Sequence, residues 1–589
     1  MILVFGGTTE GRMAVEVLEE GGSSYFYSTR DRRQEVKLTH GIRLTGGKDT
    51  GEIVAFCREH GVRLLVDATH PFAVEVHQNI CEAARQLQLP VIRYERIYEE
   101  HTDDIVWCDD YDDAIRRLED HGVDKLLALT GVQTMGKLLP YWQNHECWFR
   151  ILDRDASRKI AGQYAGFPED HLVYYEHEDT HELIGRLHPH AILTKESGRS
   201  GGFLEKEQAA RMHRVPLFAI RRPPYPAYNL LSTVDGPNGL RREVERLLPS
   251  FYPLHSGLTT GTCATAAAIA ATLLLNEGRK ELPQEVSVVL PNGETIHVPV
   301  QYGDGYASCF KDAGDDPDVT NGIEVRASVQ PSDHFQIVGG DGVGRFTLPG
   351  FDFPPGEPAI NKGPREMMRN NIKENVRVTI SVPHGEEIAQ RTFNPRLGIE
   401  GGISIIGVSG IVKPFSEEAF IESIRKCMVV AKASGADRVV INSGAKSERF
   451  VRALYPTLPR QAFVEYGNYI GETLKMADEL GFAHVTLGVM LGKAVKLAAG
   501  HLDTHSRRAT MDKQFIRQML LEAGCDVDIS DITLARELWE RMAPESIEAF
   551  ADVVIRHCEQ HCCPLLPNGS LTILLIDDEG RIYQLRNRT

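Results

Sequence analysis

The sequence predicts an α/β protein with more than one domain, and three observations support this prediction. The chain has 589 residues, which is more than one hydrophobic core normally organises. In the first 250 residues, short continuous apolar runs alternate with segments of helical periodicity, which is the pattern of a parallel sheet covered by helices. After a hairpin-like stretch, the same alternation returns from about residue 403.

Composition and charge exclude several classes of protein. Hydrophobic residues make up 42% and charged residues 25% of the chain, as in ordinary soluble domains. The formal net charge of -17 argues against nucleic acid as a partner, although a local cluster of donors can still bind an acidic small molecule. No signal peptide is evident, and the apolar run at 264–275 is too short to cross a bilayer, so we expect a cytoplasmic protein without membrane contact. The 11 cysteines lack regular spacing and are expected to be reduced.

The first expected strand, residues 2–5, ends in a glycine-rich turn, GGTTEG at 6–11, before a helical segment at 12–20. Such a unit can bind a nucleotide, because glycine lets the backbone approach a phosphate at a helix N-terminus. The spacing differs from G-x-G-x-x-G, and any tight turn of this kind needs glycine, so the turn alone is a weak indication. Arg30 follows the second strand, where a ribose or 2′-phosphate is read, but an exposed loop arginine would look the same.

Polar clusters follow the later apolar runs of this half, and parallel strands place such clusters at one edge of the sheet. His70, which follows the run at 64–66, is a candidate proton donor or ligand contact, and a residue that caps a turn is the alternative. Lys195 and Arg199 follow the run at 191–193 in a glycine-rich loop suited to carboxylates. A solvated surface loop would have a similar composition.

Four motifs carry a family resemblance: GGTTEG at 6–11, DATHPFA at 67–73, TGVQ at 130–133, and KESG at 195–198 continuing to GFLEK at 202–206. Together they resemble the precorrin-6A reductase family of corrin-ring biosynthesis over the whole first half. The resemblance implies two Rossmann-like lobes with parallel sheets, NADH or NADPH in the cleft, and reduction of one C=C bond of the macrocycle. Under it, we expect the cofactor to contact Gly6, Gly7, Thr8, Arg30, Thr69 and Gly131, and the substrate to contact His70, Lys195, Ser197 and Arg199.

A proline-broken segment, PSFYP at 249–253, follows the last helical stretch of the first half. Proline ends helices, and such segments are typical of linkers between domains. We therefore predict one domain at 1–250, a linker at 251–255 and a second domain at 256–589.

The second half opens with SGLTTGTC at 256–263, which runs into an Ala/Leu-rich helix. The free N–H groups and dipole of a helix N-terminus favour an anionic ligand, with Thr262 as the expected N-cap. A capped helix packed on small residues is an equal alternative. A hairpin is expected at 286–300 around PNG. The acidic stretch at 311–322 lacks EF-hand spacing, so its carboxylates, including Asp315, are expected to cap backbone donors or hold ligand hydroxyls rather than a metal.

Donors gather again in the later α/β region. The segment GVMLGKA at 488–494 is not a P-loop, because its spacing is short and no Ser or Thr follows the lysine. Lys493, Thr504 and His505 nonetheless lie within one short stretch together with a second lysine and a second histidine. Exposed helix lysines explain two of these residues, and the clustering favours a ligand.

These segments also carry a resemblance, through LTTGTCA at 258–264, KDAGDDPD at 311–318, GGDGVG at 339–344, NPRLGI at 394–399 and THS at 504–506. They resemble the cobalt-precorrin-5B C1-methyltransferase family over residues 255–585. The resemblance implies S-adenosylmethionine as methyl donor and an α+β lobe followed by an α/β lobe. Asn442 departs from the threonine that the family often shows before its Ser-Gly turn. The residues expected to bind the donor are Thr260, Gly261 and Thr262, and those expected to bind substrate are Asp315, Lys493, Thr504 and His505.

A tail segment stands outside both resemblances, with histidines and cysteines spaced four apart at 557–563. This spacing on a helix can bind zinc, but buried cysteine is more common, and we expect no metal site.

The two halves together predict a bifunctional enzyme of anaerobic cobalamin synthesis that acts on cobalt-corrinoid intermediates. The second half would methylate C1 of cobalt-precorrin-5B, and the first half would reduce the product, cobalt-precorrin-6A, to 6B. A tetrapyrrole-binding or cobalt-handling protein without turnover is the alternative. A nucleotide-sugar reductase is a third possibility, but its Y-x-x-x-K pair is missing from the expected position. The choice of NADH or NADPH, the proton donor and a homo-oligomeric state stay open.

Overall fold

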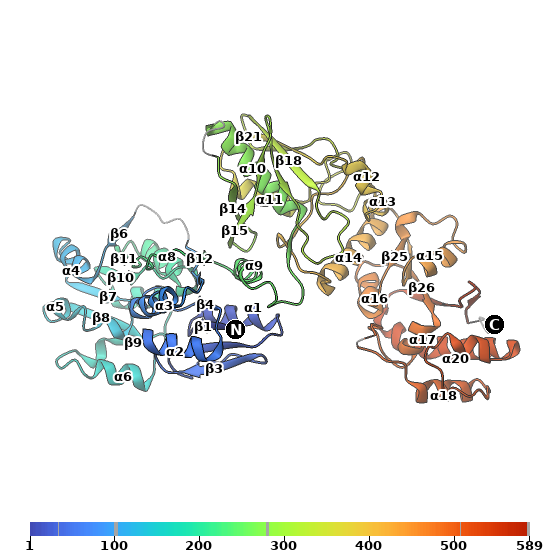
Figure 1. Ribbon diagram of the computed structural model, residues 1–589, viewed down its shortest axis with the longest axis horizontal. Helices are drawn as coiled ribbons and strands as arrows, with labels where there is room; N and C mark the ends of the chain where they lie inside the picture. Colours follow the sequence, from blue (N-terminus) through green and yellow to red (C-terminus); the bar gives the residue numbers. More distant parts are fainter. Residues whose placement is uncertain (33, 99–103, 278–281, 507, 586–589) are drawn as a thin grey trace. The chain divides into compact units, whose positions relative to one another are not determined.

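The computed structural model describes residues 1–32, 34–98, 104–277, 282–506 and 508–585. The chain forms two compact units, coloured along the sequence in Figure 1. The first unit comprises residues 1–255 together with 289–297, and the second comprises 256–288 together with 298–589. The tip of the hairpin expected at 286–300 therefore belongs to the first unit.

The first unit contains two parallel six-stranded sheets. The first sheet has the order β12-β5-β4-β1-β2-β3 and the second β6-β11-β10-β7-β8-β9. The chain leaves the first sheet after β5 and returns to it as β12. The strands of the first sheet are β1 (Ile2–Phe5), β2 (Tyr25–Thr29), β3 (Gly41–Thr45), β4 (Leu64–Asp67), β5 (Val91–Tyr94) and β12 (Leu231–Val234). Those of the second are β6 (Ile105–Cys108), β7 (Lys125–Ala128), β8 (Glu146–Ile151), β9 (Leu172–Tyr174), β10 (Ala191–Lys195) and β11 (Leu217–Ile220).

Helices cover both faces of each sheet, because the inner strands are apolar on both sides. The first lobe carries α1 (Thr9–Glu19) and α9 (Pro237–Leu247) on one face and α2 (Thr50–His60) and α3 (Val74–Leu87) on the other. In the second lobe, α4 (Tyr111–Asp120), α5 (Leu139–Trp142) and α6 (Asp155–Ala161) lie opposite α7 (Thr180–Leu187) and α8 (Phe203–His213). Three short 3₁₀ turns are η1 (Val132–Thr134), η2 (Glu169–His171) and η3 (Arg199–Gly201). The prediction of two Rossmann-like lobes with parallel sheets is confirmed.

The segment predicted as a linker packs into the first lobe. Phe251 and Tyr252 are buried in the core cluster that includes α1 and α9. The Tyr252 hydroxyl also donates a hydrogen bond to the Val17 carbonyl (3.0 Å). Two aromatic side chains bury too much apolar surface to remain in a loose connection, so residues 251–252 belong to the folded lobe.

The second unit begins with an α+β lobe built around α10 (Thr260–Glu277). The alanines on α10 are almost fully buried, and their small side chains let the helix pack closely on β17, β18 and α11. The main sheet has the order β16-β17-β18-β21-β19, antiparallel except between β19 and β21. Its strands are β16 (Gln301–Tyr302), β17 (Ala307–Phe310), β18 (Glu324–Pro331), β19 (Gln336–Gly339) and β21 (Val376–Ser381). The pairs β13 (Gly257–Leu258) with β23 (Ile411–Val412), β14 (Glu285–Val289) with β15 (Thr295–Pro299), and β20 (Arg345–Phe346) with β22 (Ile399–Glu400) surround it with α11 (Lys362–Asn371), α12 (Gly385–Ala389) and α13 (Asn394–Leu397).

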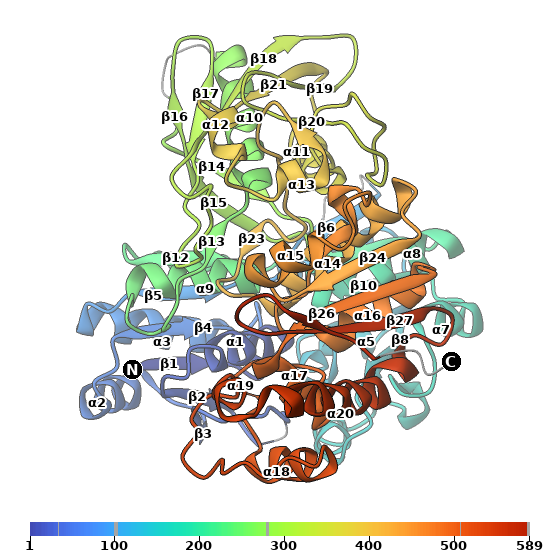
Figure 2. The same ribbon diagram turned by 90° about the vertical axis from the view of Figure 1, so that its right-hand side faces the viewer.

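An α/β lobe follows, with strand order β25-β24-β26-β27-β28. The first four strands are parallel and β28 is antiparallel. Figure 2 shows β24, β26 and β27 side by side, with α17 and α20 on one side of them. The strands are β24 (Arg438–Asn442), β25 (Phe463–Glu465), β26 (His484–Met490), β27 (Ser570–Ile576) and β28 (Ile582–Tyr583). The helices are α14 (Glu417–Ala433), α15 (Ala445–Arg452), α16 (Ile470–Glu479), α17 (Leu491–Ala498), α18 (Lys513–Glu522), α19 (Glu537–Arg541) and α20 (Pro544–Cys562), with 3₁₀ turns η4 (Arg460–Ala462) and η5 (Cys563–Leu565).

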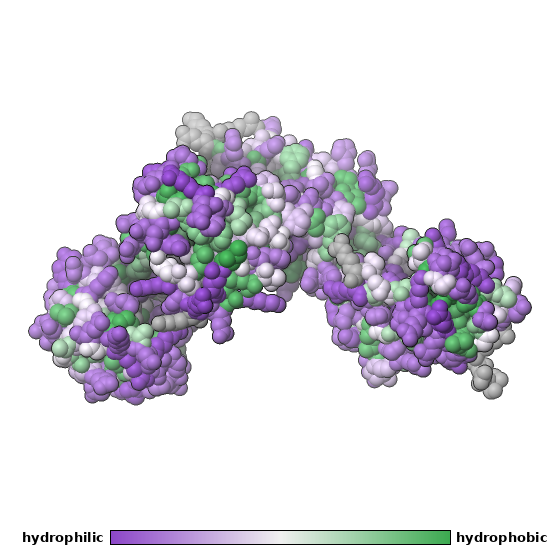
Figure 3. Space-filling model, turned by 60° about the horizontal axis from the view of Figure 1, so that its bottom comes forward, coloured by the Kyte–Doolittle hydropathy of each residue, from purple (hydrophilic) through white to green (hydrophobic). Residues whose placement is uncertain are grey.

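The predicted succession of an α+β lobe and an α/β lobe is confirmed. The face drawn in Figure 3 is largely hydrophilic, with apolar side chains in small scattered patches. Among the residues that the structure describes, no helix is both long enough and apolar enough to cross a membrane.

Candidate functional sites

A buried carboxylate organises the carboxyl edge of the first lobe. Asp67, the last residue of β4, is fully buried. Its Oδ1 accepts hydrogen bonds from the Thr69 amide (2.9 Å), the Thr69 hydroxyl (2.6 Å) and Nη1 of Arg93 (3.1 Å). Its Oδ2 accepts one from the Tyr225 hydroxyl (2.8 Å). These bonds fix the turn that carries Thr69 and His70, and they occupy the Thr69 hydroxyl.

His70 is neutral at physiological pH. Its Nδ1 accepts a hydrogen bond from the Phe72 amide (3.2 Å), so Nε2 carries the ring hydrogen. Burial, with the positive charges of Arg96 and Lys195 nearby, lowers the pKa of His70 to about 3. The ring can therefore donate a hydrogen bond to a ligand, but it does not carry an ionisable proton near pH 7.

Lys195 reaches the same place from the other lobe. It ends β10, and its Nζ lies 5.3 Å from the centre of the Phe72 ring, two residues beyond His70. Lys195 makes no hydrogen bond or ion pair with another residue that the structure describes. Burial lowers its pKa to about 8, with the charges of Lys137 and Arg96 acting in the same direction. The structure thus brings His70 and Lys195 together at the junction of the two lobes.

Two residues that sequence reasoning missed tie the lobes together. Arg96, just beyond β5, donates from Nη1 to the Ser197 carbonyl (2.7 Å), and its Nε lies 3.3 Å from Oε2 of Glu10. The other oxygen of Glu10 accepts a hydrogen bond from the Ser200 hydroxyl. The Ser197 hydroxyl donates to the Gly201 carbonyl (3.1 Å), so Ser197 shapes the loop. Glu10 lies in the first turn of α1, and an acidic residue at that place was the one feature of the sequence that could have indicated its contact with Arg96.

The glycine-rich turn after β1 is partly used by the protein itself. Gly7 has φ +102°, and its amide donates to the Tyr27 hydroxyl (3.1 Å). Thr8 caps α1, because its hydroxyl accepts from the Gly11 amide (3.1 Å). A Cβ at Gly6 would lie 2.3 Å from that Tyr27 hydroxyl, so glycine is required there by the fold.

Three further predicted residues of this unit make few contacts within it. Arg30 is exposed after β2 and forms no hydrogen bond or ion pair within the described parts of the chain. Gly131, after β7, has φ +84°, and no described atom lies within 4 Å of the place a Cβ would take. Arg199 donates from Nη1 to the Asn292 carbonyl of the hairpin tip (3.5 Å), at a bond length too long to be strong.

The threonine turn of the second unit is satisfied within the chain. The Thr260 hydroxyl accepts from the Ile406 amide (2.9 Å), and the Gly261 amide donates to the Ile406 carbonyl (2.9 Å). The Thr262 hydroxyl donates to the Gly410 carbonyl (2.6 Å). The predicted N-cap is wrong: α10 starts at Thr260, and Thr259 caps it by accepting from the Thr262 amide (3.2 Å). Gly261 and Thr262 therefore do not offer their amides to a ligand in this structure.

The acidic stretch at 311–322 is organised by an internal ion pair. Buried Lys311 donates to the Asp318 carboxylate and to the Thr320 hydroxyl (2.7 Å). Asp318 in turn accepts from the Thr320 amide (2.7 Å), as expected for a carboxylate that caps backbone donors. Asp315 lies exposed in this loop.

Lys493, Thr504 and His505 gather beside the loop that follows β25. Lys493, on α17, donates to the Gly467 carbonyl, and burial lowers its pKa to about 8. The Thr504 amide donates to the Asn468 carbonyl (3.0 Å), and the neighbouring His505 amide donates to the Asp503 carboxylate (2.9 Å). Lys493 and Thr504 thus contact the same loop, and His505 is the residue after Thr504, whereas Asp315 lies in the α+β lobe.

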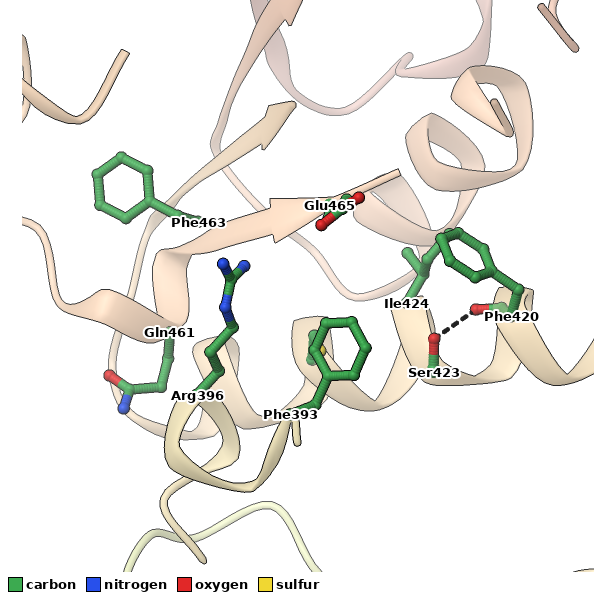
Figure 4. Close-up of a pocket in the computed structure, with 9 residues that line it drawn as sticks. Phe393, Arg396, Phe420, Ser423, Ile424, Gln461, Phe463 and Glu465 are labelled. Atoms are coloured by element: carbon green, nitrogen blue, oxygen red, sulfur yellow. Dashed lines mark hydrogen bonds between the residues drawn. The ribbon is translucent and has the colours of Figure 1, made fainter. Parts of the chain in front are cut away.

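A small cavity beside β25 contains a carboxylate that sequence reasoning missed. Figure 4 shows Glu465 at the end of β25, with aromatic rings of Phe393 and Phe420 on the surrounding helices. The cavity has a volume of about 20 Å³, which holds one water molecule at most. Burial raises the pKa of Glu465, against the opposing charge of Arg396. The side chain makes no hydrogen bond or ion pair with another described residue.

The histidines and cysteines at 557–563 point in different directions. Nε2 of His557 lies 2.8 Å from the Glu522 carboxylate, whereas Cys558 and Cys562 are fully buried in the apolar core. Cys563 is exposed. Within the described residues, no group of three or more His, Cys, Asp or Glu is arranged to hold a metal ion.

Each of the two units matches a family of known proteins. Residues 250–414 match the family model described as CbiD, and residues 503–585 match the CbiD C-terminal domain. A cobalt-precorrin-5B C(1)-methyltransferase from Prosthecochloris aestuarii (strain DSM 271 / SK 413) is 42% identical over 347 residues, which cover 55% of this chain and 94% of that protein. The chain belongs to the CbiD family.

Residues 1–236 of this CbiD-family chain match the model described as precorrin-6x reductase CbiJ/CobK. The solved CbiD structure from Archaeoglobus fulgidus is 32% identical, with a TM-score of 0.26 over 43% of this chain and 83% of that one. The solved CobK precorrin-6A reductase is 21% identical, with a TM-score of 0.35 over 42% of this chain and 97% of that one. The family matches confirm both resemblances that the sequence motifs indicated.

Proposed function

We propose that this chain catalyses two consecutive steps of cobalamin synthesis on cobalt-corrinoid intermediates in the cytoplasm. The second unit transfers a methyl group from S-adenosylmethionine to C1 of cobalt-precorrin-5B. The first unit then reduces the product, cobalt-precorrin-6A, to cobalt-precorrin-6B with a nicotinamide cofactor. The observation that carries the proposal is the 42% identity to a named cobalt-precorrin-5B C(1)-methyltransferase along 94% of its length, in a chain that also matches the precorrin-6x reductase family.

The fusion has a physical advantage if the steps are consecutive. A product released by one unit meets the tethered second site at a raised effective concentration. No shared site is needed for this effect, and nucleic acid has no part in it. Whether two copies of the chain associate is independent of the proposal.

The first unit fits a nicotinamide cofactor at the edge where β1 and β7 end. The turn after β1 opens an 11-residue helix capped by Thr8, and helix N-termini favour phosphate. At the equivalent place in the second lobe, no described atom lies within 4 Å of a Cβ position at Gly131. Arg30 is free to meet the adenosine ribose or a 2′-phosphate, and the absence of an acidic residue at 30 permits NADPH as well as NADH. When bound, the cofactor supplies the hydride.

The residues at the lobe junction divide the remaining work of the reduction. Reduction of a C=C bond also needs a proton on the neighbouring carbon, and Lys195 holds one in a site without a neighbouring acid. With a pKa of about 8, its ammonium is mostly protonated at pH 7 yet donates more readily than an ordinary lysine. Neutral His70 donates a hydrogen bond to the substrate, and the Asp67 network keeps it in place.

Methyl transfer depends chiefly on geometry. The donor sulfonium must be held in line with C1 at close range, so positioning outweighs acid–base chemistry. The threonine turn that the sequence favoured for this role is occupied by its own contacts, and the residues around β25 are the better candidates.

The proposal is tested with purified full-length protein, cobalt-precorrin-5B, S-adenosylmethionine and reduced nicotinamide, by mass spectrometry of the products. We expect a gain of one methylene unit, followed by a gain of two hydrogens. Without nicotinamide the methylated intermediate should accumulate, and without S-adenosylmethionine neither change should occur. Binding of the corrinoid with no change in its mass would instead indicate a protein that handles tetrapyrroles without turnover.

A further inference from the structure

The α/β lobe of the second unit has the strand order of a nucleotide-binding sheet. The chain passes from β24 to β25 on one side and then crosses to β26 on the other side of β24. In open parallel sheets, ligands bind beyond the carboxyl ends of the strands where the strand order reverses in this way. A ligand of this lobe is therefore expected where Asn442, Glu465 and Met490 end their strands.

The turn after β24 is held by hydrogen bonds from both sides and has a glycine, Gly444, at its centre. Gly444 has φ +149°, a conformation that other residues rarely adopt. Asn442 is fully buried, and its Oδ1 accepts a hydrogen bond from the Gly444 amide (3.1 Å). Ser447 accepts from the Ser443 amide (3.1 Å). Asn442 thus stabilises the turn through its hydrogen bond to Gly444. The turn can still bind a ligand although this chain has asparagine where the family often has threonine.

Glu465 stands beside this turn. It ends the second strand of the lobe, about 20 residues beyond Gly444, and its Oε1 lies 3.3 Å from the place a Cβ on Gly444 would take. An acidic side chain in this position, next to the glycine turn of the first strand, is how nucleotide-binding sheets read ribose hydroxyls. Within the described residues, no hydrogen bond or ion pair occupies the Glu465 carboxylate, although the side chain is partly buried.

Space for the rest of a ligand lies farther along the same edge. A hollow of about 260 Å³ opens where β26 and β27 end, lined by Met490, Gly492, Trp539 and Asp578 among others. Asp578 forms an ion pair with Lys446 in the first turn of α15 (2.8 Å), so the hollow adjoins the helix that the Gly444 turn begins. No described atom lies within 4 Å of a Cβ position at Gly492.

We propose that S-adenosylmethionine binds along this edge, with Glu465 accepting hydrogen bonds from the ribose hydroxyls beside the Gly444 turn and the rest of the donor directed towards the hollow near Trp539. This assignment rests on the proposed methyltransferase function. It moves the donor out of the α+β lobe, where the Thr260 and Thr262 hydroxyls are committed to the segment at 406–410.

The test measures equilibrium binding of S-adenosylhomocysteine and its 2′-deoxy and 3′-deoxy ribose analogues to the full-length protein by calorimetry. Glu465→Gln should weaken S-adenosylhomocysteine binding by about 10- to 100-fold, the effect of losing a hydrogen bond to a charged group. In the wild type, at least one of the deoxy analogues should bind correspondingly more weakly, and in Glu465→Gln that difference should largely disappear. Glu479→Gln, at the far end of α16 and exposed, is the matched control and should bind like the wild type.

Two outcomes would overturn the assignment in different ways. If Glu465→Gln binds S-adenosylhomocysteine as the wild type does, while Thr260→Val loses binding, the donor lies at the threonine turn and the proposed site is wrong. If the wild-type protein binds none of these ligands, the methyltransferase function itself fails, and the site fails with it. Circular dichroism of each variant distinguishes loss of a contact from loss of the fold.

Discussion

Replacing Lys195 with methionine should stabilise the first unit while it disables the reduction. Burial lowers the pKa of Lys195 from 10.5 to about 8, a difference that corresponds to an unfavourable contribution of up to about 3 kcal/mol to folding when the group is charged. Methionine has a similar length and carries no charge, so Lys195→Met removes that contribution. The proton supplied in the reduction is lost as well, which should lower kcat of the reductase by about 100- to 10,000-fold.

The stabilisation by Lys195→Met should depend on pH in a defined direction. The folded pKa of Lys195 lies below the unfolded pKa, so the cost of its charge is fully present below pH 8 and is relieved as pH rises from 8 towards 10.5. The advantage of Lys195→Met should therefore shrink across that window. The reductase rate of the wild type should fall above pH 8, as the ammonium loses its proton.

Urea unfolding followed by tryptophan fluorescence measures the stability, because Trp107, Trp142 and Trp148 lie in the first unit and only Trp539 of the four lies in the second. Lys125→Met, a half-buried lysine on β7 paired with Glu146, is the matched control and should lose stability slightly. A Lys195→Met protein that is less stable than the wild type at pH 7, or one that keeps the wild-type reductase rate, would refute the reasoning.

Three other changes have defined outcomes. Gly261→Ala places a Cβ 2.7 Å from a proline ring and should destabilise the second unit by about 1–3 kcal/mol in urea unfolding; an unchanged midpoint would contradict the packing. Arg30→Ala should raise KM for NADPH by less than about tenfold and leave KM for NADH unchanged, because the side chain is exposed; equal effects on both would remove Arg30 from the phosphate position. A fragment 1–255 should keep reductase activity and a fragment that ends before Tyr252 should unfold more easily by several kcal/mol; equal stability of the two fragments would make the buried tyrosine irrelevant.

The sequence was a good guide to the fold, because the alternation of apolar strands and helices is a local property. The central strands of the two parallel sheets are buried on both faces, and this burial is visible in runs such as residues 64–66 and 191–193. The position of polar residues just after the carboxyl ends of the strands also identified His70 and Lys195 as candidates, and the structure places both near the Phe72 ring. The prediction of a linker at 251–255 relied on the flanking prolines, whereas the structure buries the two aromatic residues between them, Phe251 and Tyr252, in the core.

Site residues were harder to predict where their partners are distant in sequence. The N–H groups at Gly261 looked available because their acceptor, the Ile406 carbonyl, lies about 145 residues away. Glu465 carried no local signal, and its interest appears only when β24 and β25 lie side by side. Arg96 likewise contacts the opposite lobe of the first unit, and no sequence motif near Arg96 predicts this contact.

The central claim is that one chain performs both reactions on the same corrinoid. Cobalt-precorrin-5B is incubated with the full-length protein, S-adenosylmethionine labelled with deuterium in its methyl group, and NADH or NADPH labelled with deuterium on the transferred face of C4. High-resolution mass spectrometry then reads both labels in single product molecules. The account predicts a product that carries the labelled methyl group and one further deuterium from the nicotinamide. A product that carries the methyl label and never the second deuterium, with either cofactor, would contradict it.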